Sequence, residues 1–254
     1  MSRVALYESR LRSSRFEGFS LVELLVVMTV IGLLAALLFP ALSAARENSR
    51  RIRCGQNLRQ INLALALYAL DNHDVLPPPQ EPVGYWPSML WPQYVNLGLL
   101  LCPTDQAAIL SNSNAPCTNA DGAPRCYLIN DFVDYYATQY GVAPGWNSNI
   151  WSLHMRQSCI AHPSATIAFA EKADSSSAYG VNIFQSPTGS YLTNVAENRH
   201  GNLFGARTKG ASNFAMTDGS VQLVPYGEAT CPLNLWAVLD QWRIAAALCR
   251  PHLR

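Results

Sequence analysis

Charged residues are scarce in this sequence. They make up 14% of its 254 residues, against about 25% in an average soluble domain, and the formal net charge is only +1. A protein that binds nucleic acid through its phosphates needs an excess of Lys and Arg, which this chain lacks. The composition therefore predicts no nucleic-acid partner.

Signatures of enzymes and of metal centres are also missing. The sequence has no Gly-x-Ser-x-Gly elbow and no compact pairing of a nucleophile with a base. It has no Cys-x-x-Cys pair and no dense run of acidic residues. By these signatures we expect no enzyme, no catalytic residue, no cofactor and no metal.

One long apolar run dominates what is present. From Leu24 to Phe39 no residue is charged, and the uncharged stretch continues to Ala45, about 22 residues where about 20 span a bilayer. The run is too long for a secretory signal peptide and has no break at a cleavage site. A plain signal anchor would explain its length, and it would explain the basic leader that holds the N-terminus in the cytoplasm. The leader arginines are Arg3, Arg10, Arg12 and Arg15.

A plain anchor leaves two features unexplained. Glu23 lies inside the apolar segment, where a charge costs about 2.5 to 3.5 kcal/mol at mid-bilayer and is usually functional. Arginines just beyond the segment weaken the charge asymmetry that orients an anchor. They are Arg46, Arg50, Arg51 and Arg53.

The stretch "RFEGFSLVELLVV", residues 15–27, resembles the type IV prepilin family, which includes the pseudopilins of type II secretion. The resemblance implies that a prepilin peptidase cuts between Gly18 and Phe19 and that Phe19 is then N-methylated. Counted from Phe19, Glu23 is the fifth residue and Pro40 the twenty-second, where the family has its glutamate and its helix-bending proline. The implied partners are the peptidase/methyltransferase, copies of itself or other pilins in a filament, an inner-membrane assembly platform and the lipid bilayer.

This resemblance suggests a purpose for Glu23. Cleavage creates a positively charged amine on Phe19, and the amine of one subunit can pair with Glu23 of a neighbour, which offsets much of the cost of the buried carboxylate. The alternative is that Glu23, one turn inside the span, reaches back to the headgroups and has no role in assembly. Both interpretations stay open.

One helix is predicted from about Ser20 to about Leu70. Beyond Pro40, which should kink it, the pattern becomes amphipathic. At 1.5 Å per residue, roughly 50 residues would reach about 75 Å. The polar and proline-rich "DNHDVLPPP" ends it. The apolar stripe expected to be buried consists of Ile52, Leu58, Ile61, Leu65 and Tyr68.

Three parts follow from this organisation: a leader at 1–18, an N-terminal pilin helix at 19–74 that crosses the membrane at about 20–45, and a periplasmic head at 75–254. In the head, strand-like runs such as "YLIND", "ATIAFAE" and "SNFAMTDGSVQLV" alternate with loops rich in Pro, Gly, Ser and Asn. They predict an α+β fold in which the long helix packs on an antiparallel sheet. Residues 234–249 read as a second helix.

The head also resembles, more loosely, a large group of prepilin-type proteins. The matching runs are "LLCPTD", "CYLIND", "IAHPSATIAFAEKAD" and the final "RH" and "NFAMTDGSV". In that group a histidine precedes Asp-Gly by nine residues, whereas seventeen residues separate His200 from Asp218 here. The resemblance implies a fold and a location but no reaction.

Asp218 has two interpretations. Asp218-Gly219 lies between alternating apolar residues, a pattern typical of a hairpin whose two-residue turn needs positive φ. Alternatively, Asp218 forms a cation site with carboxylates such as Glu171 or Asp174, because calcium prefers several oxygen ligands.

The cysteines indicate the compartment. All seven follow the predicted cut, and six lie in a head that would face an oxidising periplasm. We expect disulfides among these six, with Cys117–Cys126 and Cys231–Cys249 as candidate pairs, although six cysteines allow fifteen connectivities. Cys54, in the helix, is expected to be unpaired. The six are Cys102, Cys117, Cys126, Cys159, Cys231 and Cys249.

These features together predict a structural subunit of a type IV pilus-like filament or of a type II secretion pseudopilus, made as a single-pass inner-membrane protein. The alternative is a membrane-anchored periplasmic enzyme or ligand-binding head that uses a pilin-like anchor.

Overall fold

The computed structural model describes residues 20–79, 84–105, 119–141, 153–174, 176–183, 193–200 and 210–244. By its internal contacts the chain divides into two units, Met1–Ala45 and Arg46–Arg254. The boundary falls inside the first helix, so the second unit contains both the C-terminal half of that helix and the head.

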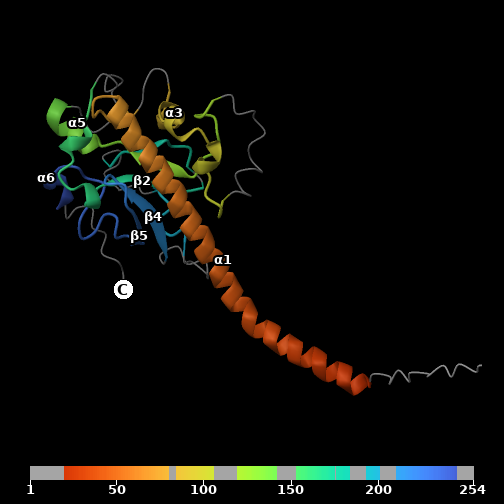
Figure 1. The fold of residues 1–254 in the computed structure, drawn as a ribbon. Coiled ribbons are helices and arrows are strands. Elements are labelled where there is room, and N and C mark those ends of the chain that lie inside the picture. The colour runs from red at the N-terminus through yellow and green to blue at the C-terminus, as the bar shows by residue number, and fades with distance from the viewer. Residues whose placement is uncertain are drawn as a thin grey trace, which may run out of the picture. The chain divides into compact units, whose positions relative to one another are not determined.

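The first helix, α1, runs from Leu21 to Asp71 and includes Pro40, in agreement with the predicted helix (Figure 1). It ends where two residues adopt left-handed backbone, His73 with φ 57° and Asp74 with φ 70°. The amide of Asp74 donates to the carbonyl of Ala69 at 2.7 Å, which closes the last turn. The prolines that follow cannot donate to a continued helix.

The part of α1 in the second unit buries one stripe. Its buried residues recur at spacings of three and four, and they are Cys54, Leu58, Ile61, Asn62, Ala64, Leu65 and Ala69. Ile52, predicted to belong to this stripe, is 54% exposed instead. Two residues before Cys54, it lies about 200° away around the helix, on the opposite face.

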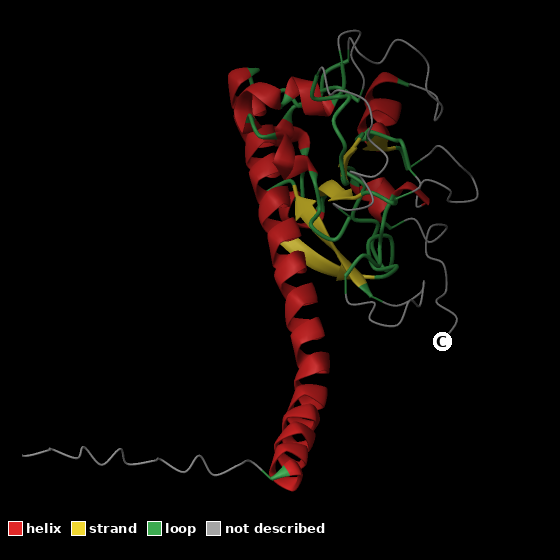
Figure 2. Ribbon diagram, turned by 90° about the vertical axis from the view of Figure 1, so that its right-hand side faces the viewer, coloured by secondary structure: helices red, strands yellow, loops and turns green. Residues whose placement is uncertain are grey.

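Within the described residues of the head, five strands form a sheet in the order β3-β1-β2-β4-β5. Figure 2 shows the C-terminal half of α1 lying along it. Neighbouring strands are antiparallel except β1 and β3, which are parallel, so the predicted α+β fold is confirmed but the sheet is mixed. The strands are β1 (Tyr127–Asn130), β2 (Ile167–Glu171), β3 (Gly180–Val181), β4 (Ala211–Met216) and β5 (Val221–Pro225).

Two apolar cores cover the two faces of the sheet. The core on the α1 side joins Leu58 and Ile61 to Tyr127 and Phe169, and the other core gathers Leu128, Phe214 and Met216 around Trp236. Because successive side chains of a strand point to opposite faces, Tyr127 and Leu128 belong to different cores. Every residue of β1 and β2 is therefore buried.

Short helices connect these elements. They are α2 (Trp86–Met89), α3 (Trp91–Tyr94), η1 (Leu97–Leu100), α5 (Val133–Tyr140), η3 (Gln157–Cys159), η4 (Pro163–Ala165) and α6 (Asp240–Arg243).

The prediction of a second helix at residues 234–249 was wrong for most of the described part of that range. Residues 234–239 form a turn and irregular structure, and in the described part only Asp240–Arg243 is helical, as α6. The backbone amides of Val238 and Leu239 donate to the carboxylate of Asp134 on α5, at 2.7 and 2.9 Å. These tertiary hydrogen bonds replace the ones that a helix would have supplied.

Candidate functional site

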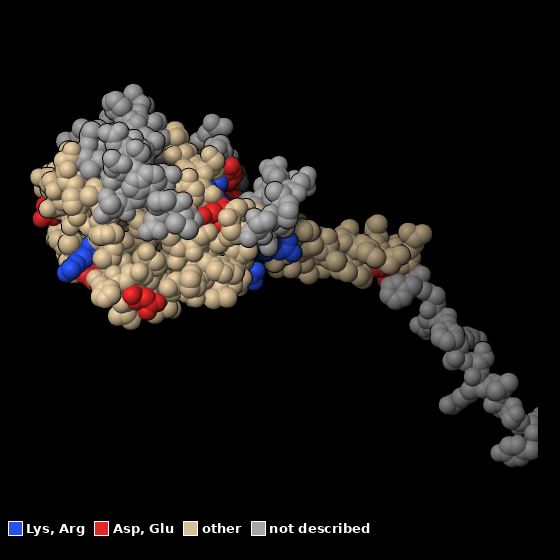
Figure 3. All heavy atoms as spheres, turned by 90° about the horizontal axis from the view of Figure 1, so that it is seen from above, with Lys and Arg blue, Asp and Glu red and all other residues tan. Residues whose placement is uncertain are grey.

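The apolar part of α1 is suited to a membrane. Its most apolar window of 18 residues has a mean hydropathy of 2.7, and none of that window is buried within the structure. The polar side chains there are satisfied locally, because the hydroxyls of Thr29 and Ser43 donate to the carbonyls of Val26 and Phe39. In Figure 3 the surface of this part of α1 is almost entirely tan, the colour of residues other than Lys, Arg, Asp and Glu.

Glu23 makes a contact that the interpretation of the sequence overlooked. Its carboxylate accepts from the backbone N–H of Ser20 at 2.9 Å, while the hydroxyl of Ser20 accepts from the N–H of Val22 at 3.3 Å. This reciprocal arrangement is a capping box, which satisfies amides that have no partner at a helix start. The signal was present as Ser-x-x-Glu at residues 20–23. The predicted processing residues, Gly18 and Phe19, lie outside the described residues.

In the head, His200 is the centre of a buried polar cluster. Its Nδ1 lies 2.9 Å from Glu47 Oε1 on α1, and its Nε2 lies 2.9 Å from Glu171 Oε1 at the end of β2. The side chains of His200 and Glu171 are 1% and 0% exposed. Burial lowers the pKa of His200, but the hydrogen bonds and charges of Glu171 and Glu47 outweigh it, so the pKa lies above its usual value. An imidazolium can donate to both carboxylates at once.

Glu171 is held by further donors. Its Oε2 accepts from the backbone N–H of Asn213 on β4 at 3.1 Å, and the side-chain amide of Asn213 donates to the backbone carbonyl of Arg51 at 3.1 Å. The cluster therefore ties α1 to β2, to β4 and to the segment that carries His200. A buried carboxylate without such partners would be costly.

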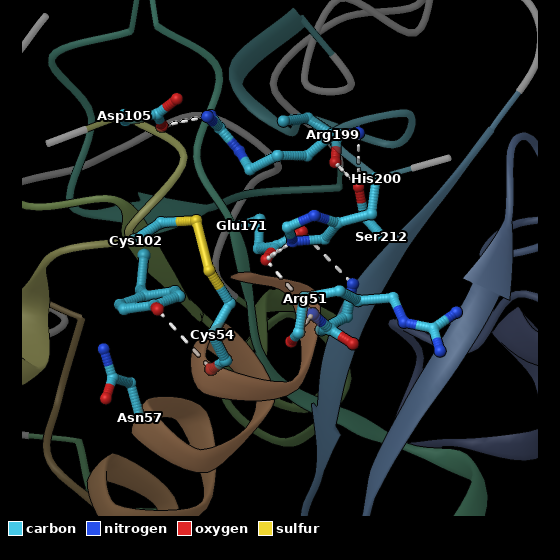
Figure 4. A network of polar contacts seen from close by, with 12 residues as sticks. Arg51, Cys54, Asn57, Cys102, Asp105, Glu171, Arg199, His200 and Ser212 are labelled. Carbon is cyan, nitrogen blue, oxygen red and sulfur yellow. Dashed lines mark hydrogen bonds and ion pairs between the residues drawn. A yellow bond between two sulfur atoms is a disulfide. The ribbon is translucent and has the colours of Figure 1, made fainter. Parts of the chain in front are cut away.

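Arg199, beside His200 in sequence, forms a second ion-pair group. Its guanidinium contacts the carboxylate of Asp105 (Figure 4). It also contacts the carbonyl of Lys172 and pairs with Asp174 at 2.9 Å. Burial lowers the pKa of Arg199 to about 10.

The structure corrects the prediction for Cys54. Cys54 forms a disulfide with Cys102, 48 residues later, and this bond fastens α1 to the loop after η1 (Figure 4). The expectation that Cys54 is unpaired was wrong, because the apolar stripe of α1 turns its side chain into the head, where it is 0% exposed.

The other described cysteines differ in burial and in whether they form a disulfide. Cys126 is a buried free thiol, contrary to the expected Cys117–Cys126 pair, and burial raises its pKa to about 11. Cys159 is an exposed free thiol. Cys231 is disulfide-bonded. Cys117 and Cys249 lie outside the described residues, so the Cys231–Cys249 pair stays a prediction.

Asp218 lies in a turn, as one of its two interpretations held. It is exposed, and its Oδ1 accepts from the N–H of Ser220 at 2.8 Å. Four residues separate β4 from β5, but the N–H of Met216 donates to the carbonyl of Ser220 at 2.8 Å. Residues 217–219 therefore form the loop, and of these only Gly219 has positive φ, at 92°. This geometry is that of a three-residue hairpin loop, so the expected two-residue turn was wrong.

The carboxylates proposed for a cation site with Asp218 do not come together. Glu171 bonds to His200, and Asp174 pairs with Arg199. Asp218 follows the end of β4, whereas His200 pairs with Ala211 at its start. The grouping that the structure does bring together is Cys54, Cys102, Glu171 and His200, whose ligand atoms lie within 4.8 Å of one another.

Two family models match the chain. Residues 13–39 match the "Prokaryotic N-terminal methylation motif", and residues 43–84 match "Protein of unknown function (DUF1559)". The first match covers the predicted cut and the start of α1, and the second covers the rest of α1. No solved structure gives a significant match.

Three curated relatives, each named type II secretion system core protein G, are similar to part of the chain. The protein of Escherichia coli (strain K12) is 38% identical over 56 residues, which are 22% of this chain and 39% of the relative. That of Pectobacterium carotovorum subsp. carotovorum is 36% identical over 59 residues, 23% of this chain and 38% of the relative. That of Klebsiella pneumoniae is 38% identical over 58 residues, 23% of this chain and 41% of the relative.

The alignments thus span about two fifths of the relatives' length. With the apolar part of α1, these matches indicate a membrane-anchored, pilin-like protein. The family models and the relatives therefore support a prepilin- or pseudopilin-like family for this chain.

Proposed function

We propose that the chain is a structural subunit of a pilus-like or type II secretion pseudopilus filament, cleaved after Gly18 and N-methylated at Phe19. The observation that carries the proposal is a methylation-motif match at 13–39 that continues into a long apolar helix with one carboxylate, Glu23, in its first turn. The proposed parts are a leader at 1–18, a pilin helix at 19–74 and a head at 75–254.

The proposed location is the inner membrane, with the leader in the cytoplasm and the head in the periplasm, before the subunit enters a filament. The basic leader supports this orientation. The Cys54–Cys102 disulfide supports an oxidising compartment for the head. The proposed partners are a prepilin peptidase/methyltransferase, other pilins or pseudopilins, an assembly platform and lipid.

Assembly would rest on the apolar part of α1. Its side chains are exposed within one chain, so they are free to pack against the same segments of neighbouring subunits once the subunit leaves the bilayer. Pairing of the Phe19 amine with a neighbour's Glu23 would fix the register of the two helices.

The intact mass of the mature chain tests the processing step. We expect a chain that begins at Phe19 and carries one additional methyl group. Gly18→Leu should leave the precursor uncut, because the side chain would stand where the peptidase must seat the end of the leader. A mature N-terminus elsewhere, or an uncut chain in cells that process other prepilins, contradicts the proposal.

A further inference from the structure

The Cys54–Cys102 disulfide and the polar groups beside it form one cluster. The two sulfur atoms, a carboxylate oxygen of Glu171 and a ring nitrogen of His200 lie within 4.8 Å of one another, and all four residues are buried. Figure 4 shows Glu171 between the sulfur pair and the His200 ring. Two sulfurs, one imidazole nitrogen and one carboxylate oxygen are a donor set that suits tetrahedral zinc.

The spacing of these atoms is close to what a zinc ion requires. Zinc bonds of about 2.0 to 2.3 Å place tetrahedral ligand atoms about 3.3 to 3.8 Å apart. The cluster therefore needs side-chain movements of about an ångström or less, provided that the sulfur–sulfur bond is opened. Each of the four side chains comes from a different segment of the head or of α1, so the fold has already assembled the set.

The neighbours of the cluster orient its members as metal ligands are oriented. Nδ1 of His200 is held by Glu47 at 2.9 Å, which leaves Nε2 facing Glu171. A histidine that binds a metal through one nitrogen commonly donates the other N–H to a carboxylate, and Glu47 is in that position. The backbone N–H of Asn213 donates to Oε2 of Glu171, while Oε1 faces His200 at 2.9 Å and accepts a longer hydrogen bond, 3.4 Å, from the side-chain amide of Asn213.

We propose that Cys54, Cys102, His200 and Glu171 form a redox-controlled zinc site, which binds one Zn²⁺ when the two cysteines are thiols and excludes it when they form the disulfide. A thiol or phosphine reductant supplies two electrons, and two protons are taken up as the disulfide becomes two thiols. Binding then releases both thiol protons, and the proton on Nε2 of His200 where it carries one, while His200 keeps its Nδ1 proton and donates it to Glu47. This site does not depend on the filament role proposed above.

Cobalt(II) is the probe, because its visible spectrum reports tetrahedral coordination. The full-length chain in detergent micelles is reduced with a phosphine, freed of metal under anaerobic conditions and titrated with Co²⁺. We expect one equivalent to produce the thiolate-to-cobalt charge-transfer band and intense visible bands, and Zn²⁺ to abolish both. The oxidised chain should produce neither.

Variants locate the site. Cys54→Ser and Cys102→Ser should each weaken the charge-transfer band and lower the affinity. Glu47→Ala should keep the bands but raise the Kd about 10- to 100-fold, as expected for loss of a carboxylate behind a histidine ligand. Cys159→Ser and Cys231→Ser are the controls and should bind cobalt as the wild type does, because neither residue belongs to the cluster.

Folding of the reduced chain is followed in the same samples by circular dichroism and thermal unfolding. Zn²⁺ should raise the Tm of the reduced wild type and leave that of the oxidised chain unchanged. The proposal is overturned if the reduced wild type gains neither the cobalt bands nor a higher Tm with zinc. It is equally overturned if Cys54→Ser binds cobalt with the wild-type spectrum and affinity.

Discussion

His200 and Glu171 lie 2.9 Å apart, from Nε2 to Oε1, with both side chains almost completely removed from solvent. They come from segments 29 residues apart in the chain. Glu47, on the other side of the same ring, is 153 residues away from His200. One imidazole thus connects α1 to the sheet, and the stability of the head should depend on it.

His200→Ala in the oxidised chain should lower the free energy of unfolding by about 3 to 5 kcal/mol, because it leaves the buried carboxylate of Glu171 without its charged partner. Thermal or urea unfolding measures this. The control is His162→Ala. The His162 side chain is 50% exposed and that of its partner Asp240 is 71% exposed, so this ion pair should contribute less than about 1 kcal/mol. Equal losses for the two variants would show that the buried pairing is not stabilising.

The Cys54–Cys102 bond closes a loop with a sequence separation of 48 residues. In the chain-entropy model a loop of this size contributes about 4 kcal/mol, so Cys102→Ser should lower the unfolding free energy by an amount up to that. Peptide mapping without reductant should recover Cys54 and Cys102 on one linked peptide. Cys159→Ser, at an exposed free thiol, should change stability little. A Cys102→Ser chain as stable as Cys159→Ser would contradict the prediction.

Glu23 has two separable roles, as a helix cap and as a proposed partner of Phe19. Glu23→Ala removes both, whereas Ser20→Ala removes the capping hydroxyl and keeps the charge. We expect Glu23→Ala to insert and be cleaved normally but to be depleted from sheared filaments relative to the membrane pool. Ser20→Ala should incorporate nearly as the wild type does.

Glu23→Gln separates the capping role of Glu23 from its charge, because glutamine can also cap a helix at this position of a capping box. It should restore the cap without the charge, and its incorporation should fall between wild type and Glu23→Ala. If Glu23→Ala and wild type enter filaments equally, the carboxylate has no assembly role, and the interpretation that it reaches to the headgroups stands.

Asp131, after β1, is buried, and desolvation raises its pKa well above the usual value. Its Oδ1 has no hydrogen-bond partner, and its side chain lies against Gly180. The folded state therefore keeps a proton that the unfolded state releases near pH 4, so Asp131 costs stability as the pH rises from the unfolded pKa to the folded pKa.

Asp131→Asn should remove that cost. Its unfolding free energy should exceed that of the wild type at pH 7, and the difference should shrink toward pH 4. Urea unfolding across this range measures it, with the exposed Asp218→Asn as the control. A constant difference between wild type and Asp131→Asn at every pH would contradict the assigned cause.

Local patterns in the sequence determined the long helix, its apolar segment and the hairpin. The α1 helix was predicted to within about one residue at each end, because apolar composition, periodicity and the three prolines after it act over a few residues. The β4–β5 hairpin followed from alternation around Asp218-Gly219, although its loop length did not. The Ser20–Glu23 cap was equally local and could have been predicted.

The tertiary structure alone decided which distant groups meet. The disulfide joins residues 48 apart, and His200 meets Glu47 across 153 residues. No spacing rule relates positions so far apart, since their contact depends on which face of α1 packs on the sheet and on the register of β2 against β4. That packing placed Cys54 inside and Ile52 outside. It also brought two sulfurs, an imidazole and a carboxylate into one buried cluster, which a search for closely spaced ligands could not find.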